Sequence, residues 1–158
     1  MKATLKRTVI VFAIGIVLVQ FLPLKKNSDT ATGPADITKV YTVPDNVHQV
    51  LQKACYDCHS NNTTYPWYSH VQPVGWWLND HVKEGKRHLN FAEFGSYISK
   101  RKIKKLKEVS GTINEGEMPL SSYTIIHTNA RLSDEEKVLV TTWAASLAKQ
   151  IADTAHIQ

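Results

Sequence analysis

Residues 53–60 read Lys-Ala-Cys-Tyr-Asp-Cys-His-Ser and hold the two cysteines of the chain, Cys55 and Cys58, three positions apart and directly before a histidine. Pro44 stands where a first helical turn would begin, and apolar residues recur from there at helical spacing up to the first cysteine. The pattern predicts a helix with one buried face that leads into the cysteine pair. We expect the remaining helices to pack around this motif.

Two thiols at this spacing with an imidazole next to them form the attachment motif of c-type haem. Cys55 and Cys58 can add to the two vinyl groups of one porphyrin, and the ring of His59 then lies against the iron as its proximal ligand. The sequence contains one such motif. We therefore expect one haem c with its iron, bonded through Cys55 and Cys58 and ligated by His59.

Three other uses of the cysteine pair remain open. A thioredoxin-like redox pair follows a strand and opens a helix, whereas this pair ends a helical pattern. A structural zinc site needs further ligands; His70 can supply one, but the sequence shows no second ligand pair. A disulfide between Cys55 and Cys58 would close a very small loop and add little stability.

The second axial ligand decides between electron transfer and ligand binding. Met118 is the only methionine besides Met1, and it lies in the polar segment 115–119, Glu-Gly-Glu-Met-Pro. A thioether on a loop with glycine and proline suits the distal side of a haem, and Met/His ligation raises the reduction potential. We expect Met118 as distal ligand. The alternatives are a bis-histidine haem with His70 or His81 and a methionine that only fills a core gap.

The remainder of the chain predicts helices and no strand. A capping box at residues 133–136 precedes apolar residues at helical spacing, which predicts a long C-terminal helix. Helices are also expected over 74–89 and, capped by Asn90, over 91–109, whereas 60–73 is irregular. The expected fold class is all-α, a small cytochrome c-like helical domain around one covalent haem.

The N-terminus predicts a membrane or targeting segment. Residues 9–22 are apolar except for Gln20, cations stand on both sides, and no convincing cleavage site follows. We expect residues 1–24 to form an N-terminal membrane helix, as an anchor or an uncleaved signal, that contacts the membrane through residues 9–24.

Two further parts follow along the chain. Residues 25–40 are rich in Ser, Thr, Asp, Gly and Pro, which predicts a flexible tether, and residues 41–158 form the expected c-type haem-binding domain. The net charge of +5 comes from cations around the N-terminal apolar run, so the domain is formally neutral and nucleic-acid binding is not expected. The basic face from Lys83 to Lys107 would dock an acidic redox partner, lie on anionic lipid, or simply be solvated.

The chain resembles the bacterial haem-binding domain family, a monohaem relative of class I cytochromes c. The likeness covers most of residues 41–150 and is carried by the segments 55–61 (CYDCHSN), 65–69 (YPWYS), 115–119 (EGEMP) and 130–133 (ARLS). The resemblance implies a covalent haem, the ligand pair His59 and Met118, and an anchor in the bacterial inner membrane with the haem domain facing the periplasm. Unlike a soluble class I cytochrome c, the segment between the motif and the methionine is heavy in Trp and Lys.

Two functions fit these patterns. The first is a membrane-anchored monohaem c-type cytochrome that carries single electrons to a periplasmic redox partner and has a closed iron. The second is a haem-based redox or gas sensor or ligand-binding module, whose iron would open readily. An enzyme is not expected, because a peroxidase needs an open distal side with an acid–base residue and often a second haem.

Overall fold

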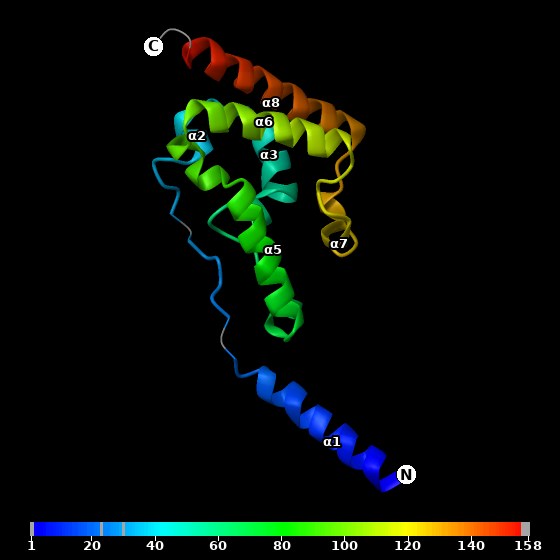
Figure 1. The fold of residues 1–158 in the computed structure, drawn as a ribbon. Helices are drawn as coiled ribbons and strands as arrows, with labels where there is room; N and C mark the ends of the chain where they lie inside the picture. Colours follow the sequence, from blue (N-terminus) through cyan, green and yellow to red (C-terminus); the bar gives the residue numbers. More distant parts are fainter. Residues whose placement is uncertain (1, 23, 30, 156–158) are drawn as a thin grey trace.

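A computed structural model describes residues 2–22, 24–29 and 31–155 (Figure 1). Within these ranges every regular element is a helix, and the one isolated antiparallel β-bridge joins Ser28 and Asn62. The expected all-α class is therefore confirmed. In chain order the elements are α1 (Lys2–Val19), α2 (Ile37–Val40), α3 (Asp45–Ala54), α4 (Tyr56–His59), η1 (Trp67–His70), α5 (Val74–His88), η2 (Phe91–Ser96), α6 (Ser99–Asn114), α7 (Ser121–Thr124), η3 (Thr128–Ala130) and α8 (Asp134–Ala155).

The core lies where α3, α6 and α8 meet. Figure 1 shows α6 and α8 side by side, with α3 against them. One buried cluster joins the three helices and contains Leu51 of α3, Leu106 and Ile113 of α6, and Val140 and Leu147 of α8. Burial of a side chain of this size contributes about 1.5–3 kcal/mol to stability. The cluster therefore fixes α3, and with it the cysteine motif that follows.

The predicted capping box at the start of α8 is confirmed. The main-chain N–H of Ser133 donates to Glu136 Oε2 at 2.9 Å, and the N–H of Glu136 donates to Ser133 Oγ at 3.2 Å. Lys53 near the end of α3 also donates to Glu136. One carboxylate thus satisfies the first turn of α8 and ties this helix to α3.

The expected single helix over 91–109 is wrong, because the chain forms η2 and then α6, which continues to Asn114. The break has a local cause at Gly95. Its N–H donates to the carbonyl of Ala35 at 2.7 Å, and a Cβ at this position would lie 2.7 Å from Val40 Cγ2. The contact between η2 and the segment of α2 thus uses the N–H of Gly95, which in a continuous α-helix would donate to the carbonyl of Phe91.

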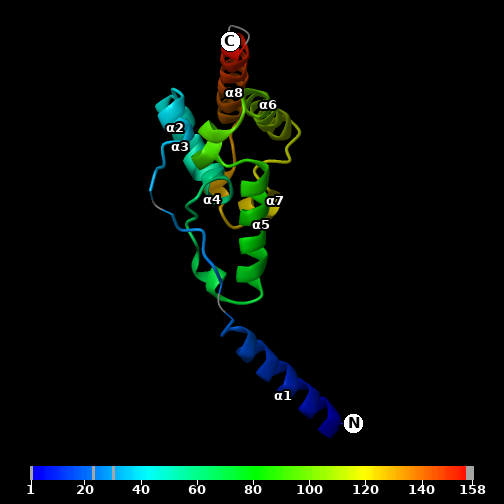
Figure 2. The ribbon, with the colours of Figure 1, turned by 60° about the vertical axis from the view of Figure 1, so that its left-hand side comes forward.

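Helix α1 projects away from the domain (Figures 1 and 2). It carries Lys2, Lys6 and Arg7 and ends at Val19. In the described part of the chain, no helix combines the length and the apolar character needed to cross a membrane. The expected membrane-spanning helix in residues 1–24 is therefore not supported, since three of the residues in α1 are cations. Met1 and Pro23 of this segment lie outside the described residues.

Part of the segment 25–40, expected as a flexible tether, packs against the domain. The side-chain amide of Asn27 donates to the carbonyl of Ser60 and to the hydroxyl of Thr63, both at 2.9 Å. Further along, Ile37 of α2 is fully buried in the core. A four-residue helix is too short to show a periodicity, so the sequence pattern carries no sign of it.

Candidate functional site

The cysteine pair stands at a break between two helices. Cys55 separates α3 from α4 with φ −125° and ψ −42°. The N–H groups of Cys58 and His59 both donate to the carbonyl of Cys55, at 3.2 and 2.9 Å. One tight turn therefore carries both thiols and the imidazole.

Helix α5 lies directly against this turn. At Gly85 a Cβ would stand 2.6 Å from the carbonyl oxygen of Cys58, a distance that no side chain could tolerate without movement. The glycine thus permits the close approach of α5 to α4. Residues that follow α5 are consequently held next to the motif.

The ring of His59 is oriented by one of these residues. Its Nδ1 lies 2.9 Å from the carbonyl oxygen of Leu89, which can only accept, so Nδ1 carries the proton and Nε2 keeps its lone pair. Burial lowers the pKa of His59 and outweighs the opposing effect of its hydrogen bonding to the backbone of Leu89 and Gly85. The imidazole is neutral and fixed, the state in which histidine ligates a metal.

Both cysteines are free, half-buried thiols. Burial, and next the neighbouring Cys58, raise the pKa of Cys55 to about 12; burial and the carboxylate of Asp57 raise the pKa of Cys58 to about 11. Redox-active cysteine pairs have a lowered pKa, because the thiolate is the reactive form. This environment argues against the thioredoxin-like alternative.

Met118 follows a well-defined helix end. The N–H of Gly116 donates to the carbonyl of Ile113 at 3.2 Å. The N–H groups of Glu117 and Met118 donate to the carbonyl of Thr112, at 2.9 and 3.2 Å. This is a Schellman cap, and Gly116 supplies its left-handed residue with φ 74°. The methionine is thus placed by the end of α6.

Two adjoining cavities bring these residues together. The first cavity, of about 290 Å³, is lined by Cys55, His59 and Met118. The second cavity, of about 250 Å³, is lined by Cys58 together with the same His59 and Met118. The rest of the first cavity is lined largely by apolar side chains, among them Leu89, Phe91, Val109, Ile113 and Leu132. An imidazole nitrogen, a thioether sulfur and two thiols around an apolar space are a donor set that fits a haem.

The rim of the first cavity holds polar residues that the sequence did not single out. Lys105, Glu108 and His88 line it, and Lys105 Nζ donates to Glu108 Oε2 at 2.6 Å. In the sequence Lys105 is one of many cations in a basic run. Only its three-residue spacing from Glu108, which allows an ion pair on one helix face, could have distinguished it from its neighbours.

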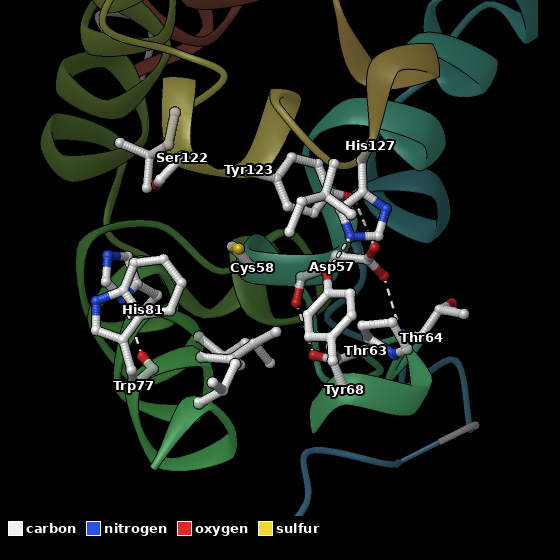
Figure 3. Close-up of a pocket in the computed structure, with 16 residues that line it drawn as sticks. Asp57, Cys58, Thr63, Thr64, Tyr68, Trp77, His81, Ser122, Tyr123 and His127 are labelled. Atoms are coloured by element: carbon white, nitrogen blue, oxygen red, sulfur yellow. Dashed lines mark hydrogen bonds between the residues drawn. The ribbon is translucent and has the colours of Figure 1, made fainter. Parts of the chain in front are cut away.

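A third cavity, of about 80 Å³, adjoins Cys58 (Figure 3). Tyr123 donates to Asp57 Oδ2 at 2.7 Å and stacks on the ring of His127, with 4.3 Å between centroids. Burial, and then the bond to Asp57, raise the pKa of Tyr123. Tyr68 Oη lies 2.8 Å from His127 Nε2. Asp57, inside the cysteine motif, is thereby joined to α7, which follows Met118.

The alternative histidine ligands differ in position. His81 lines the second and third cavities, and its Nδ1 lies 2.9 Å from the carbonyl oxygen of Trp77. His70 is not among the residues that line these cavities and instead lies 3.4 Å from Lys26 Nζ. His81 thus stays a competitor of Met118.

Comparison with protein-family models gives a match to the haem-binding domain over residues 14–146, which include all four candidate site residues. Searches of curated proteins and of solved structures gave no match. The match supports a haem cofactor, in agreement with the donor set of the two cavities. It also covers most of the chain, so this protein belongs to the haem-binding domain family.

Proposed function

We propose that this protein is a monohaem c-type cytochrome that carries single electrons. Its haem is bonded through Cys55 and Cys58 and ligated by His59 and Met118. The observation that carries the proposal is that all four side chains line one pair of adjoining cavities, where the Nε2 atom of His59 has its lone pair free. The small cytochrome c-like architecture is part of the same proposal.

Each residue has a defined task in this scheme. Cys55 and Cys58 would hold the haem through thioether bonds, each the product of adding an S–H group across one vinyl group, which needs no oxidant. The haem supplies a one-electron couple between ferric and ferrous iron. The hydrogen bond to the carbonyl of Leu89 holds the ring of His59 in one orientation, and the thioether of Met118 would raise the reduction potential. Apolar lining excludes water and favours the less charged ferrous state.

The setting of the domain is part of the proposal. The cationic N-terminus and the apolar residues that follow support export, so we place the haem domain in the periplasm at the bacterial inner membrane. The side chains of residues 9–18 are exposed along α1 and suit contact with lipid. A surface concavity of about 720 Å³, lined by Lys83, Lys86, Arg87 and Arg101 among others, suits an acidic redox partner.

The test is the absorption spectrum of the full chain, produced in a host with c-type cytochrome maturation. We expect a haem that stays attached in denaturant, is low-spin in both oxidation states and does not react with carbon monoxide. Met118→Ala should open the iron to carbon monoxide, whereas the control His81→Ala should leave it closed. If His81→Ala opens the iron and Met118→Ala does not, the ligand assignment is wrong. If no covalent haem forms, the whole proposal fails.

A haem-based sensor or ligand-binding module is the second candidate. It is favoured by the third cavity, which adjoins Cys58 and shares His81 and Tyr123 with the second cavity, because a small ligand could reach the distal side from there. Rapid binding of carbon monoxide by the unmutated protein would support this function over electron transfer.

A further inference from the structure

One end of the domain carries an exposed aromatic and apolar surface that contains none of the proposed haem ligands, although Val74 and Trp77 of this surface also line the third cavity. Trp67 of η1 is 78% exposed and Trp77 of α5 is 52% exposed, and Val71 and Val74 between them are also exposed. Val74 and Trp77 lie one turn apart on α5, and η1 packs against this helix. We call these four residues the tryptophan patch. Two exposed tryptophans and two exposed valines on neighbouring, packed elements mark a candidate interaction surface.

The segment that carries the tryptophan patch is hydrogen-bonded to the chain that follows α1. The N–H of Gln72 donates to Gln20 Oε1 at 2.8 Å, and Gln20 Nε2 donates to the carbonyl of Gln72 at 3.1 Å. These bonds join the chain just after α1 to the segment between Val71 and Val74. In Figures 1 and 2, α1 leaves the domain from the end where α5 begins, opposite α8. Its apolar side chains are exposed, as those of the patch are.

Cations accompany this apolar surface. Lys25 and Lys83 line a concavity together with Trp77, in which Asp80 is the one acid. Lys26 lies beside them in the chain, with Nζ 5.4 Å from the centroid of the Tyr65 ring. Tryptophan rings with lysines around them are typical of proteins at the membrane–water interface, where the ring lies at headgroup level and the ammonium pairs with phosphate.

We infer that the tryptophan patch docks on an anionic lipid surface. Trp67 and Trp77 enter the headgroup region, Lys25 and Lys26 face lipid phosphates, and α1 contacts the same surface. The charge of the surroundings favours lipid over an apolar protein partner. The inference goes beyond the proposed electron transfer and does not depend on it, since no residue of the patch is a proposed haem ligand.

The test measures binding of the full chain to vesicles of phosphatidylglycerol and phosphatidylethanolamine by sedimentation. The double substitution of Trp67 and Trp77 by serine should lower the partition coefficient by about tenfold, because it removes the two largest apolar side chains of the patch while α1 is left unchanged. Ile98→Ser is the control, since Ile98 is 72% exposed, lies just before α6 and is not one of the four patch residues. It should bind as the unmutated protein does.

Amide hydrogen exchange locates the contact. Vesicles should slow exchange in residues 66–78, and phosphatidylcholine vesicles should do so less because they lack net negative charge. The inference is overturned if the double variant binds as strongly as the unmutated protein, if protection is confined to α1, or if the patch is protected without lipid by self-association. The haem spectrum of the double variant is recorded in parallel, and an unchanged spectrum separates this result from a failure of the proposed function.

Discussion

Lys105 shows how burial distinguishes one residue of a charged run. Lys104 and Lys105 both pair with Glu108, but the side chain of Lys105 is 14% exposed and lines the first cavity, whereas that of Lys104 is 72% exposed. A cation near the iron stabilises the ferrous state, and solvent screens it less when it is buried. We expect Lys105→Met to lower the reduction potential, by an energy on the order of 1 kcal/mol.

Redox titration of the two variants measures this effect. Lys104→Met is the control and should leave the potential almost unchanged, because its charge is exposed. Equal shifts in both variants would show that Lys105 does not act through its place at the cavity.

The candidate ligands were accessible from the sequence because their chemistry is local. Residues 55–59 form a contiguous motif, and the unusual setting of Met118 is visible in its neighbours. The hydrogen bond from His59 to Leu89 was not accessible, since it joins residues 30 positions apart. The burial of Lys105 depends in the same way on how α6 packs.

At the level of elements, the contact of α5 with α4 depends on one glycine. A Cβ at Gly85 would clash with the main chain of Cys58, so Gly85→Ala should push α5 away from the motif. Overpacking of this kind costs about 1–3 kcal/mol. We expect a lower thermal midpoint and less haem incorporation.

Gly111→Ala is the matched control for this substitution. Gly111 lies inside α6, and a Cβ there would meet nothing within 4 Å. The variant should be more stable by about 0.5–1 kcal/mol, because alanine has the higher helix propensity. If both variants behave alike in thermal unfolding, the close approach of α5 is not what Gly85 provides.

The start of α8 should respond to pH through Glu136. The hydrogen bond from Lys53 is the main cause that lowers the pKa of Glu136 in the folded protein. A lowered folded pKa contributes stability above the unfolded value of 4.5, and this contribution is lost as the pH falls through the folded pKa. Glu136→Gln should therefore be less stable than the unmutated protein at neutral pH, and the difference should shrink below about pH 4.5.

Ser133→Ala serves as the comparison for Glu136→Gln. It removes a neutral cap, so its cost of about 1 kcal/mol should persist across the same pH range. Denaturant unfolding at several pH values measures both variants. A difference for Glu136→Gln that stays constant down to pH 3 would contradict the role of its charge.

Helix type was predictable where a pattern was long enough. The capped α8 and the helix at 74–88 agree with expectation. The break after Gly95 was not, because it arises from contact with α2, which is itself too short to show a period. The boundary between η2 and α6 therefore depends on contacts between elements, which local helix propensity does not reveal.

Over the whole molecule, hydrogen bonds between distant segments hold the site closed. Asp57 and Tyr123 are 66 positions apart, and their bond joins the cysteine motif to the segment after Met118. No feature of the sequence pairs these two residues, since an aspartate within the motif and a tyrosine in an irregular stretch are each unremarkable alone. The contact between the cysteine motif and the segment after Met118 could therefore be seen only in the folded structure.

Removal of the hydrogen bond between Tyr123 and Asp57 should loosen the segment that carries Met118. Tyr123→Phe removes the hydroxyl that donates to Asp57 but keeps the ring stacked on His127. The carboxylate retains the N–H of Thr64 at 2.9 Å, so the fold should persist with a loss of about 1–2 kcal/mol. The segment with Met118 is then less firmly held, and carbon monoxide should bind the ferrous variant faster than it binds the ferrous unmutated protein.

Tyr65→Phe is the control. The hydroxyl of Tyr65 only accepts from the N–H of Asn27, and Tyr65 does not line the cavities. The control variant should lose similar stability but should not bind carbon monoxide faster. Equal rates in the two variants would mean that Asp57 and Tyr123 stabilise the domain without holding the distal ligand.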